Sequence, residues 1–232
     1  LMTILDGKKT SEALKQEIAE EVKQLKAQGK KVPHLAAVLV GDDGASLTYV
    51  GSKVKACEQV GFASTLVKLP ADISEEKLLQ EIAKLNANPE IDGYIVQLPL
   101  PKHINEQKIL LAIDPTKDVD GFHPANFGRM ALDMEAFIPA TPFGIMELLK
   151  RYKVPTQGKH VVVVGRSHIV GRPISILLSQ KGAQGNATVT LTHSHTPNLA
   201  DLTRQADIVV MALGIPEFLK GDMVKEGVTV ID

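Results

Sequence analysis

The hydrophobic positions of the chain follow two alternating patterns, a helical spacing of three to four residues and short uninterrupted runs. In residues 10–28 the apolar residues recur at helical spacing, and Thr10 or Ser11 can cap the helix. The runs at 34–40 and 160–164 are each followed by glycine and are typical of buried strands. The same criteria predict helices at 10–28, 46–60, 74–86, 105–113, from 141 onward, 172–181 and 198–205, and strands at 34–40, 62–69, 91–98, 160–164, 187–192, 207–212 and 228–231.

The order of these segments predicts the fold class. Strands that are separated by helices pair in parallel, so an α/β protein with doubly wound sheets is expected. The alternation lapses over residues 114–140, which we expect to be an irregular loop or a domain crossing. It resumes with Thr141 as a cap and Pro142 in the first turn of a helix. Two α/β domains are therefore predicted, residues 1–139 and residues 140–232, and no internal sequence repeat is found.

Composition narrows the function classes. Of 232 residues, 44% are hydrophobic and 23% are charged, which is the usual balance of a soluble globular protein. The net charge of -1 supplies no basic field for nucleic acid or for an anionic membrane, so neither is an expected partner. The single cysteine, Cys57, excludes a disulfide within the chain, and no signal-peptide pattern opens it. A cytoplasmic location is expected; Leu1, which precedes Met2, is left out of the interpretation.

A glycine-containing turn joins the predicted strand 160–164 to the next helix. Gly165 allows a sharp turn, and Gly171 allows the helix to approach the sheet closely. The helix start offers free backbone N–H groups to a pyrophosphate. Ser167 occupies the place of the middle glycine of the usual dinucleotide fingerprint, so the strand–turn–helix context carries the prediction of a dinucleotide site.

The strand after this turn indicates which dinucleotide is bound. Folds that bind NAD usually end this strand with Asp or Glu, which accepts hydrogen bonds from the ribose hydroxyls. Here the strand 187–192 runs into His193 and Ser194 without an acid. Together with Arg166 these side chains would accept a ribose phosphate, which favours NADP over NAD. The alternative is that Arg166 and Ser194 are ordinary solvated loop residues.

Two residues in the first half suit proton transfer. Tyr49 and Lys53 are separated by one helical turn and lie together on a face next to the apolar one. On spacing alone, a surface lysine beside a half-buried tyrosine is the more common arrangement. The same spacing marks short-chain dehydrogenases, but there it follows the dinucleotide fold, whereas here it precedes that fold by more than a hundred residues.

Two further segments carry polar side chains that can take part in a site, one at the end of a strand, where α/β sheets bind ligands, and one in the long loop. Gln97 follows a predicted strand and is followed by Pro99 and Pro101. Asp118, Asp120 and His123 lie in the expected irregular loop. Taken alone, each segment is more often strand-exit or turn chemistry.

Taken in order along nearly the whole chain, these motifs resemble the bifunctional methylenetetrahydrofolate dehydrogenase/cyclohydrolase family. The matching segments are Val40-Gly41-Asp42-Asp43 with Ser46, Tyr49-Val50-x-x-Lys53, Gln97-Leu98-Pro99-Leu100-Pro101, Lys117-Asp118-Val119-Asp120-Gly121, Pro139-Ala140-Thr141-Pro142 and Val164-Gly165-Arg166-Ser167-x-Ile169-Val170-Gly171. The resemblance implies a catalytic, folate-binding domain at 1–139 and a Rossmann-type NADP-binding domain at 140–232, with a cleft between them. It also implies a homodimer.

The resemblance also implies an activity and a set of folate-site residues. Methylenetetrahydrofolate would be oxidised to methenyltetrahydrofolate with NADP and then hydrolysed to formyltetrahydrofolate, in one-carbon metabolism and without a metal. Lys53 would be the central catalytic group, and Gln97 would hydrogen-bond it. Tyr49 would pack on the folate, Asp120 would accept hydrogen bonds from the pterin, and Val96 and Leu98 would complete the substrate site.

For the cofactor, the resemblance implies that Arg166 and Ser194 hold the ribose phosphate of NADP, with Gly165 and Ser167 lining the site. Members of the family continue for some tens of residues beyond the position of Asp232, so we expect the C-terminal end of this domain to be missing. The alternatives are a dehydrogenase without cyclohydrolase activity and a non-catalytic NADP-binding protein. The joint presence of Tyr49, Lys53 and Gln97 with Asp120 argues against the last.

Overall fold

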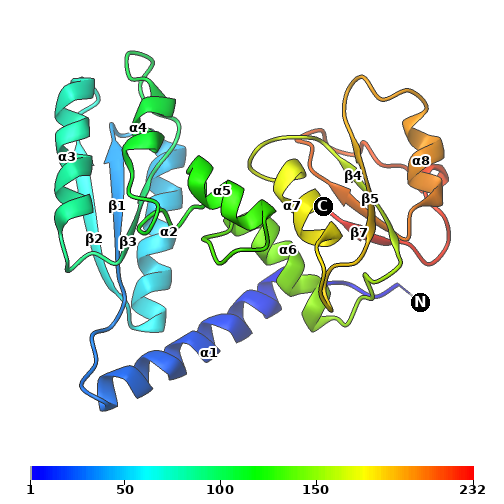
Figure 1. Cartoon of the computed structure of the whole chain (residues 1–232), viewed down its shortest axis with the longest axis horizontal. Coiled ribbons are helices and arrows are strands. Elements are labelled where there is room, and N and C mark those ends of the chain that lie inside the picture. The colour runs from blue at the N-terminus through cyan, green and yellow to red at the C-terminus, as the bar shows by residue number, and fades with distance from the viewer. Residues whose placement is uncertain (1) are drawn as a thin grey trace. The chain divides into compact units, whose positions relative to one another are not determined.

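The computed structural model describes residues 2–232, and Leu1 lies outside the described part. The chain forms two compact units. One consists of Asp6–Asn126, and the other consists of Phe127–Asp232 together with the N-terminal residues up to Leu5. Both are α/β units with parallel sheets, as predicted (Figure 1). These compact units are defined by contacts within the chain, whereas the division into a catalytic domain and a cofactor domain between residues 139 and 140 stays a prediction.

The unit Asp6–Asn126 is a three-stranded parallel sheet with helices on both faces. The strand order is β2-β1-β3. Alternate residues of the central strand face opposite sides: Ala36 and Val38 pack with α3 and α4, whereas Ala37 and Leu39 pack with α2. The elements are α1 (Gly7–Ala27), β1 (His34–Val40), α2 (Gly44–Val60), β2 (Ala63–Leu69), α3 (Glu75–Ala87), β3 (Gly93–Val96) and α4 (Glu106–Ala112), followed by α5 (Pro124–Ala131), which runs into the other unit.

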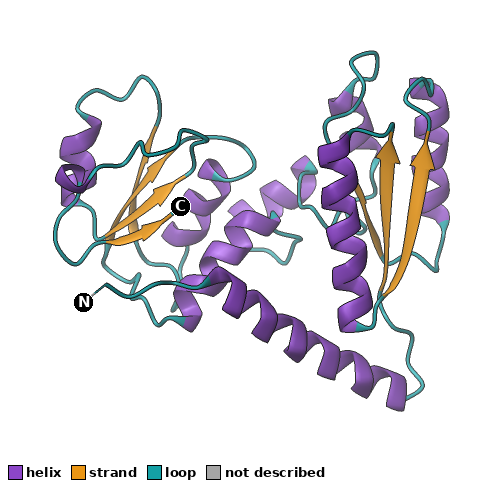
Figure 2. Cartoon of the chain, turned by 180° about the vertical axis from the view of Figure 1, so that it is seen from behind, coloured by secondary structure: helices purple, strands orange, loops and turns teal. Residues whose placement is uncertain are grey.

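The unit that contains Phe127–Asp232 has a four-stranded parallel sheet in the order β5-β4-β6-β7. Figure 2 shows the strands of both sheets in orange, with helices beside them. Val161 and Val163 of the central strand pack against α6 and α7, and Val162 and Val164 pack on the side of α8. The elements are α6 (Ala140–Arg151), β4 (His160–Val164), α7 (Gly171–Ser179), β5 (Thr188–Thr192), α8 (Leu199–Gln205), β6 (Ile208–Met211), a 3-10 turn (Gly221–Met223) and β7 (Thr229–Ile231).

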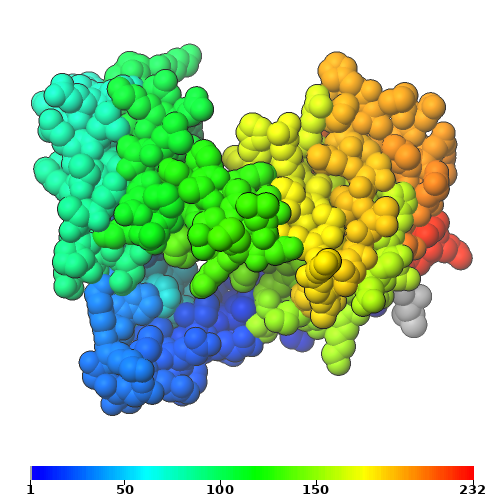
Figure 3. All heavy atoms as spheres, viewed as in Figure 1, coloured from blue at the N-terminus to red at the C-terminus, as the bar shows by residue number. Residues whose placement is uncertain are grey.

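The first helix, α1, is mostly exposed. Val22 is the buried residue of α1, and Lys15 Nζ donates to Gln59 Oε1 of α2 at 3.0 Å. The blue atoms of this helix are visible on the surface in Figure 3. Within residues 2–232, no helix combines the length and the apolar character that crossing a bilayer requires.

The two sheets begin with the same arrangement of side chains, although no sequence repeat links them. The backbone N–H of His34 donates to Asp92 Oδ2 at 2.8 Å, and that of His160 donates to Asp207 Oδ2 at 2.9 Å. Each His Nε2 also lies close to a threonine hydroxyl of the neighbouring strand, at 2.7 Å and 2.8 Å. A lysine forms an ion pair with each carboxylate, Lys31 with Asp92 and Lys225 with Asp207. The two units therefore share one way of joining their first and third strands.

This arrangement predicts acid sensitivity. The hydrogen bond from Lys225, and then that from the His160 N–H, holds the pKa of Asp207 below its usual range. A lowered folded-state pKa gives stability that is present above the unfolded value near 4 and is lost as pH falls through the folded value. Asp207→Asn should therefore be less stable than the parent protein at pH 7, and the gap should close on acidification below about pH 4. Urea midpoints measured from pH 7 to pH 3 test this.

The exposed Asp222→Asn variant is the matched control, because its carboxylate takes part in none of these contacts. Its urea midpoints should follow those of the parent protein at every pH. A constant difference between Asp207→Asn and the parent protein across the whole range would contradict the expected link to the Asp207 carboxylate.

Several expected element boundaries were wrong. α1 begins at Gly7, because Asp6 rather than Thr10 or Ser11 caps it by accepting from Lys9 N at 2.9 Å. α6 begins at Ala140 after Pro139, without a side-chain cap from Thr141. β3 covers Gly93–Val96 rather than 91–98, since a turn precedes it and Pro99 cannot donate to a neighbouring strand.

The stretch 114–140 is not irregular throughout, because it contains α5 (Pro124–Ala131). Eight residues are too few for a helix that is stable by itself. Long-range contacts hold it instead: Asn126 Nδ2 donates to Asp118 Oδ2 and to Pro115 O, both at 2.9 Å. These partners are eight and eleven residues away in the chain, so a local periodicity could not reveal them.

Candidate functional site

The helix α2 carries Tyr49 and Lys53 on its outer side. Asp43 caps it by accepting from Ser46 N at 3.0 Å, and Gly61 ends it in the left-handed region. Val50, between the two polar residues, is buried against β1 and β3. Tyr49 is 63% exposed and Lys53 is half-buried, and neither side chain has a hydrogen-bonding partner in the described part of the chain. Both are therefore free to contact a ligand.

The carboxylate of Asp120 is close enough to Lys53 to be affected by its charge. Burial raises the pKa of Asp120, the positive charge of Lys53 opposes that shift, and the neighbouring Asp118 adds to it. Within residues 2–232, no hydrogen-bond donor reaches the Asp120 side chain. A half-buried carboxylate without donors is a strong acceptor for the N–H groups of a ligand.

Its neighbour Asp118 has a different role. Asp118 is 2% exposed and accepts from His123 N and from Asn126 Nδ2, both at 2.9 Å. These bonds fix the loop that carries Asp120. The structure thus separates two acids that are only two residues apart: Asp118 is occupied by the protein, and Asp120 is free.

The same loop is attached to the sheet by β3. The hydroxyl of the buried Tyr94 donates to Asn86 Oδ1 at 2.6 Å, and Asn86 Oδ1 also accepts from Asp114 N at 3.0 Å. Gly93 is required by a close approach, since a Cβ there would lie 2.3 Å from Val119 Cγ1. The position of Asp120 relative to the sheet therefore depends on contacts made before it in the chain.

Gln97 lies at the carboxyl end of β3. Its backbone N–H donates to Val38 O at 2.9 Å, and its Nε2 donates to Leu98 O at 2.8 Å. Its Oε1 is buried and has no partner among the described residues. Among the described residues no hydrogen bond joins Gln97 to Lys53: Nε2 donates to the backbone at Leu98, and Oε1, the atom that could accept from a lysine, has no partner.

The two residues that flank Gln97 belong to the hydrophobic core. Val96 is 3% exposed and packs with the cluster between the sheet and α3, and Leu98 packs against the same cluster. Their side chains hold the end of β3 in place. The Val96 side chain is therefore not open to a ligand, and a contact from this position would have to come from its backbone.

The turn after β4 has the close contacts that its glycines predict. Gly165 has φ +114°, and a Cβ there would lie 2.3 Å from Ala212 O. A Cβ at Gly171 would lie 1.9 Å from Gly165 O. Ser167 Oγ accepts from Val170 N at 3.0 Å, so the serine in place of the middle glycine stabilises the turn before α7. The backbone here can approach a phosphate group closely.

Beside this turn is a hollow of about 480 Å³, which we call the arginine hollow. It is lined by Phe127, Arg166, Arg172, Ser175, Ile176, Leu191 and His193. Burial and the nearby charges of Arg166 and His195 lower the pKa of His193. Ser194 lies next to the lining residue His193 and is exposed. The glycine contacts and the cationic lining fit a dinucleotide that carries a ribose phosphate.

Arg172 is the lining residue that sequence reasoning missed. A signal for it exists, because a cation in the first turn of a helix lies at the positive end of the helix dipole, where acids are usual. Sequence reasoning could not show that Arg172 faces the same hollow as Arg166 and Leu191.

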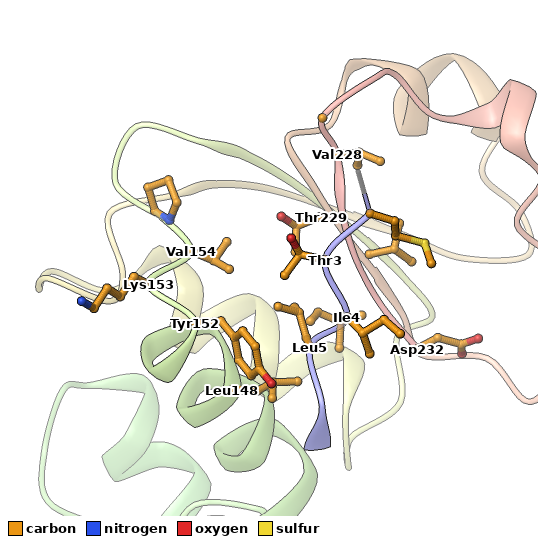
Figure 4. A pocket seen from close by; sticks show the side chains of 15 residues that line it. Thr3, Ile4, Leu5, Leu148, Tyr152, Lys153, Val154, Val228, Thr229 and Asp232 are labelled. Atoms are coloured by element: carbon orange, nitrogen blue, oxygen red, sulfur yellow. The ribbon is translucent and has the colours of Figure 1, made fainter. Parts of the chain in front are cut away.

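A larger hollow, of about 890 Å³, lies elsewhere in the same unit (Figure 4). Leu5 and its neighbours at the N-terminus, Tyr152 at the end of α6, and Thr229 of β7 line it. In the described part of the chain, none of the residues expected to bind folate or NADP contributes to this hollow. The size of a hollow therefore does not identify the functional site here.

The described residues, 2–232, contain no group of three or more His, Cys, Asp or Glu side chains that could hold a metal ion. His193 and His195 lie edge to face with ring centroids 6.1 Å apart.

Comparison with known families matches both parts of the chain. Residues 5–120 match the tetrahydrofolate dehydrogenase/cyclohydrolase catalytic domain, and residues 139–232 match the NAD(P)-binding domain of the same family. The chain is 73% identical over 231 residues to the bifunctional protein FolD of Flavobacterium johnsoniae, covering 100% of this chain and 78% of that protein. It is 67% identical to the FolD protein of Flavobacterium psychrophilum, with 100% and 79% covered.

Solved structures give the same result. A methylenetetrahydrofolate dehydrogenase/cyclohydrolase from Campylobacter jejuni aligns with TM-score 0.94 at 46% identity, covering 100% of this chain and 81% of that one. The Trypanosoma brucei enzyme, solved with NADP and an inhibitor, aligns with TM-score 0.90 at 37% identity, covering 98% and 77%. Both matched regions, the relatives and the solved structures thus lead to one conclusion: this chain belongs to the tetrahydrofolate dehydrogenase/cyclohydrolase family.

Proposed function

We propose that this protein oxidises 5,10-methylenetetrahydrofolate to 5,10-methenyltetrahydrofolate with NADP and then hydrolyses the methenyl form to 10-formyltetrahydrofolate. One observation carries this proposal: Lys53, Asp120 and the unpartnered Gln97 Oε1 all belong to the unit Asp6–Asn126, and none has a hydrogen-bonding partner there. A purely structural role would leave such groups paired. A binding module would need no lysine beside a free carboxylate.

In the proposed cyclohydrolase step, Lys53 Nζ accepts a proton from the water that attacks the cationic methenyl carbon. The new C–O bond forms as the carbon loses its iminium double bond. Cleavage of one C–N bond, with a proton delivered to that nitrogen, then releases the 10-formyl product. A positioned base typically contributes about 10²- to 10⁴-fold to such a step.

Asp120 and Tyr49 are proposed to orient the substrate. The half-buried carboxylate of Asp120 lacks donors in the protein, and the N–H groups on the pterin edge would supply them. The exposed ring of Tyr49 offers a flat surface on which folate can stack. Gln97 Oε1 is proposed to accept a hydrogen bond from Lys53 once the substrate is bound, and Val96 and Leu98 position Gln97 from the core.

The cofactor site is proposed to lie along the turn after β4. Bound there, NADP would supply the acceptor for the hydride that the methylene carbon of the substrate loses on oxidation. Gly165 and Ser167 would line the cofactor, and Arg166 and Ser194 would hold its ribose phosphate. The absence of an acid between Thr192 and Thr196 removes the group that would repel that phosphate.

A spectrophotometric assay with methylenetetrahydrofolate and either NADP or NAD tests the activity. Methenyl product formed faster with NADP is the expected result, and no product with either cofactor would overturn the proposal. Decay of added methenyltetrahydrofolate then measures the hydrolytic step. If methenyltetrahydrofolate is formed but the enzyme does not accelerate its decay, the protein is a dehydrogenase without cyclohydrolase activity.

Arg166→Ala is expected to weaken NADP binding by at least about 10-fold while changing NAD binding much less. Charge-assisted hydrogen bonds to a phosphate are about twice as strong as neutral ones, and only NADP carries the phosphate in question. Fluorescence titration of both cofactors measures the change. Equal weakening of NADP and NAD would show that Arg166 acts on their shared parts.

We also propose that the protein acts in the cytoplasm as a homodimer and without nucleic-acid or membrane partners. The dimer rests on the family resemblance, and the absence of a basic field rests on a net charge of -1. Light scattering on the purified protein should give twice the chain mass. A monomer at micromolar concentration would contradict the dimer.

A further inference from the structure

Two arginines line the arginine hollow and have no counter-ion there. Arg166 comes from the turn after β4, and Arg172 comes from the first turn of α7. Among the described residues, neither guanidinium forms an ion pair or a side-chain hydrogen bond. The lining of the hollow contains no Asp or Glu. Two like charges that share a small hollow repel one another unless an anion lies between them.

The position of Arg172 on its helix adds to the electrostatic repulsion that this cation experiences. The N-terminus of a helix carries a partial positive charge, which favours acids and disfavours cations in the first turn. α7 has no acid in its first turn, and Arg172 is its second residue. A cation at this place is locally unfavourable in the free protein, and an anion bound at the same place would make it favourable.

The rest of the hollow fits one end of a nucleotide. Ser175 and His193 add polar groups, and Phe127, Ile176 and Leu191 add apolar surface. Burial and the nearby charge of Arg166 lower the pKa of His193, which disfavours a third cation in the hollow. A phosphate monoester carries close to two negative charges at neutral pH, which two guanidinium groups can match.

We propose that Arg172 is a second phosphate-binding residue, which together with Arg166 holds the ribose phosphate of NADP and sets the preference for NADP over NAD. The inference rests on the proposed function, because it takes NADP as the cofactor. The competing role for Arg172 is the pyrophosphate, which NADP and NAD share and which a helix N-terminus also attracts.

Two small probes separate these roles. Adenosine 2′,5′-bisphosphate carries the ribose phosphate of NADP, whereas 5′-AMP lacks it, and neither carries a nicotinamide. Calorimetric titration of the full chain with both probes would compare the parent protein with Arg172→Gln, Arg172→Lys and the exposed control Lys220→Gln, which removes one positive charge outside the hollow. Thermal unfolding of each variant without ligand would verify that it is folded.

Arg172→Gln is expected to weaken the bisphosphate by about 10-fold or more and 5′-AMP by less than about 2-fold, at an unchanged unfolding temperature. Arg172→Lys should recover part of the loss, and Lys220→Gln should behave as the parent protein. Unchanged bisphosphate binding in Arg172→Gln, or equal weakening of both probes, would overturn the inference. If the parent protein itself showed no preference for the bisphosphate, the proposed cofactor would fail rather than the role of Arg172 alone.

Discussion

Lys53→Met should lower the rate of methenyltetrahydrofolate hydrolysis by about 100-fold or more while leaving NADP binding unchanged. Methionine keeps most of the length of the lysine side chain and removes its amine, so the helix α2 should retain its packing through Val50. The proton of the attacking water would then have no acceptor on α2. The loss should appear in the turnover number more than in the apparent affinity for folate, because Tyr49 and Asp120 still bind the substrate.

The chain offers a matched control for this variant on the same helix. Lys55 is exposed and two residues further on, so Lys55→Met makes the same chemical change on another face of α2. Its hydrolysis rate should stay within about 2-fold of the parent protein. A hydrolysis rate of Lys53→Met equal to that of the parent protein would exclude Lys53 as the proton acceptor. An equal loss of rate in both variants would indicate that α2 is disturbed rather than that a catalytic group is missing.

Gly171→Ala is expected to have the largest effect on stability. Its Cβ would lie 1.9 Å from Gly165 O, and backbone atoms cannot move aside as a flexible side chain can. Overpacking of this kind costs about 3 kcal/mol, and relief would require α7 to move away from β4. NADP binding should be lost with it, because the backbone at the start of α7 forms the proposed phosphate site. Urea unfolding and cofactor titration measure the two losses.

Gly144→Ala in α6 is the control. A Cβ at Gly144 meets nothing within 4 Å, and its backbone is helical. Alanine in a helix is more favourable than glycine by about 0.5–1 kcal/mol, so this variant should be slightly more stable than the parent protein. Opposite signs for two Gly→Ala changes would show that the contact with Gly165 O, rather than chain entropy, decides the outcome at Gly171. A Gly171→Ala protein as stable as the parent would refute the close packing.

Local pattern was enough where burial is nearly complete. The bounds predicted for the strands 34–40 and 160–164 agree with β1 and β4 to the residue, because a central parallel strand is covered on both faces and each of these is apolar after its first residue, a histidine. The turn at Gly165–Gly171 was also recognisable, since a side chain at either glycine would collide with backbone atoms. Such requirements act over a few residues and leave a direct mark in the sequence.

Local pattern was not enough where the structure depends on individual side-chain hydrogen bonds rather than on the burial period of a segment. Asn126 of α5 is bonded to Asp118 and Pro115, and the helix has only eight residues, which is too short a stretch for periodicity to define a helix by itself. The Nε2 of Gln97 donates to Leu98 O, and Oε1 has no partner among the described residues. No spacing rule determines the orientation of a side-chain amide.

The sequence by itself determined the fold class, the dinucleotide turn and the residue types available for the chemistry. These follow from short-range sterics and from the burial period of each segment. Only the tertiary structure decided that Asp118 is occupied while Asp120 is free, and that Arg172 faces the same hollow as Arg166. The physical reason is that desolvation and charge act between groups that the fold brings together, and their separation in space is not contained in their separation along the chain.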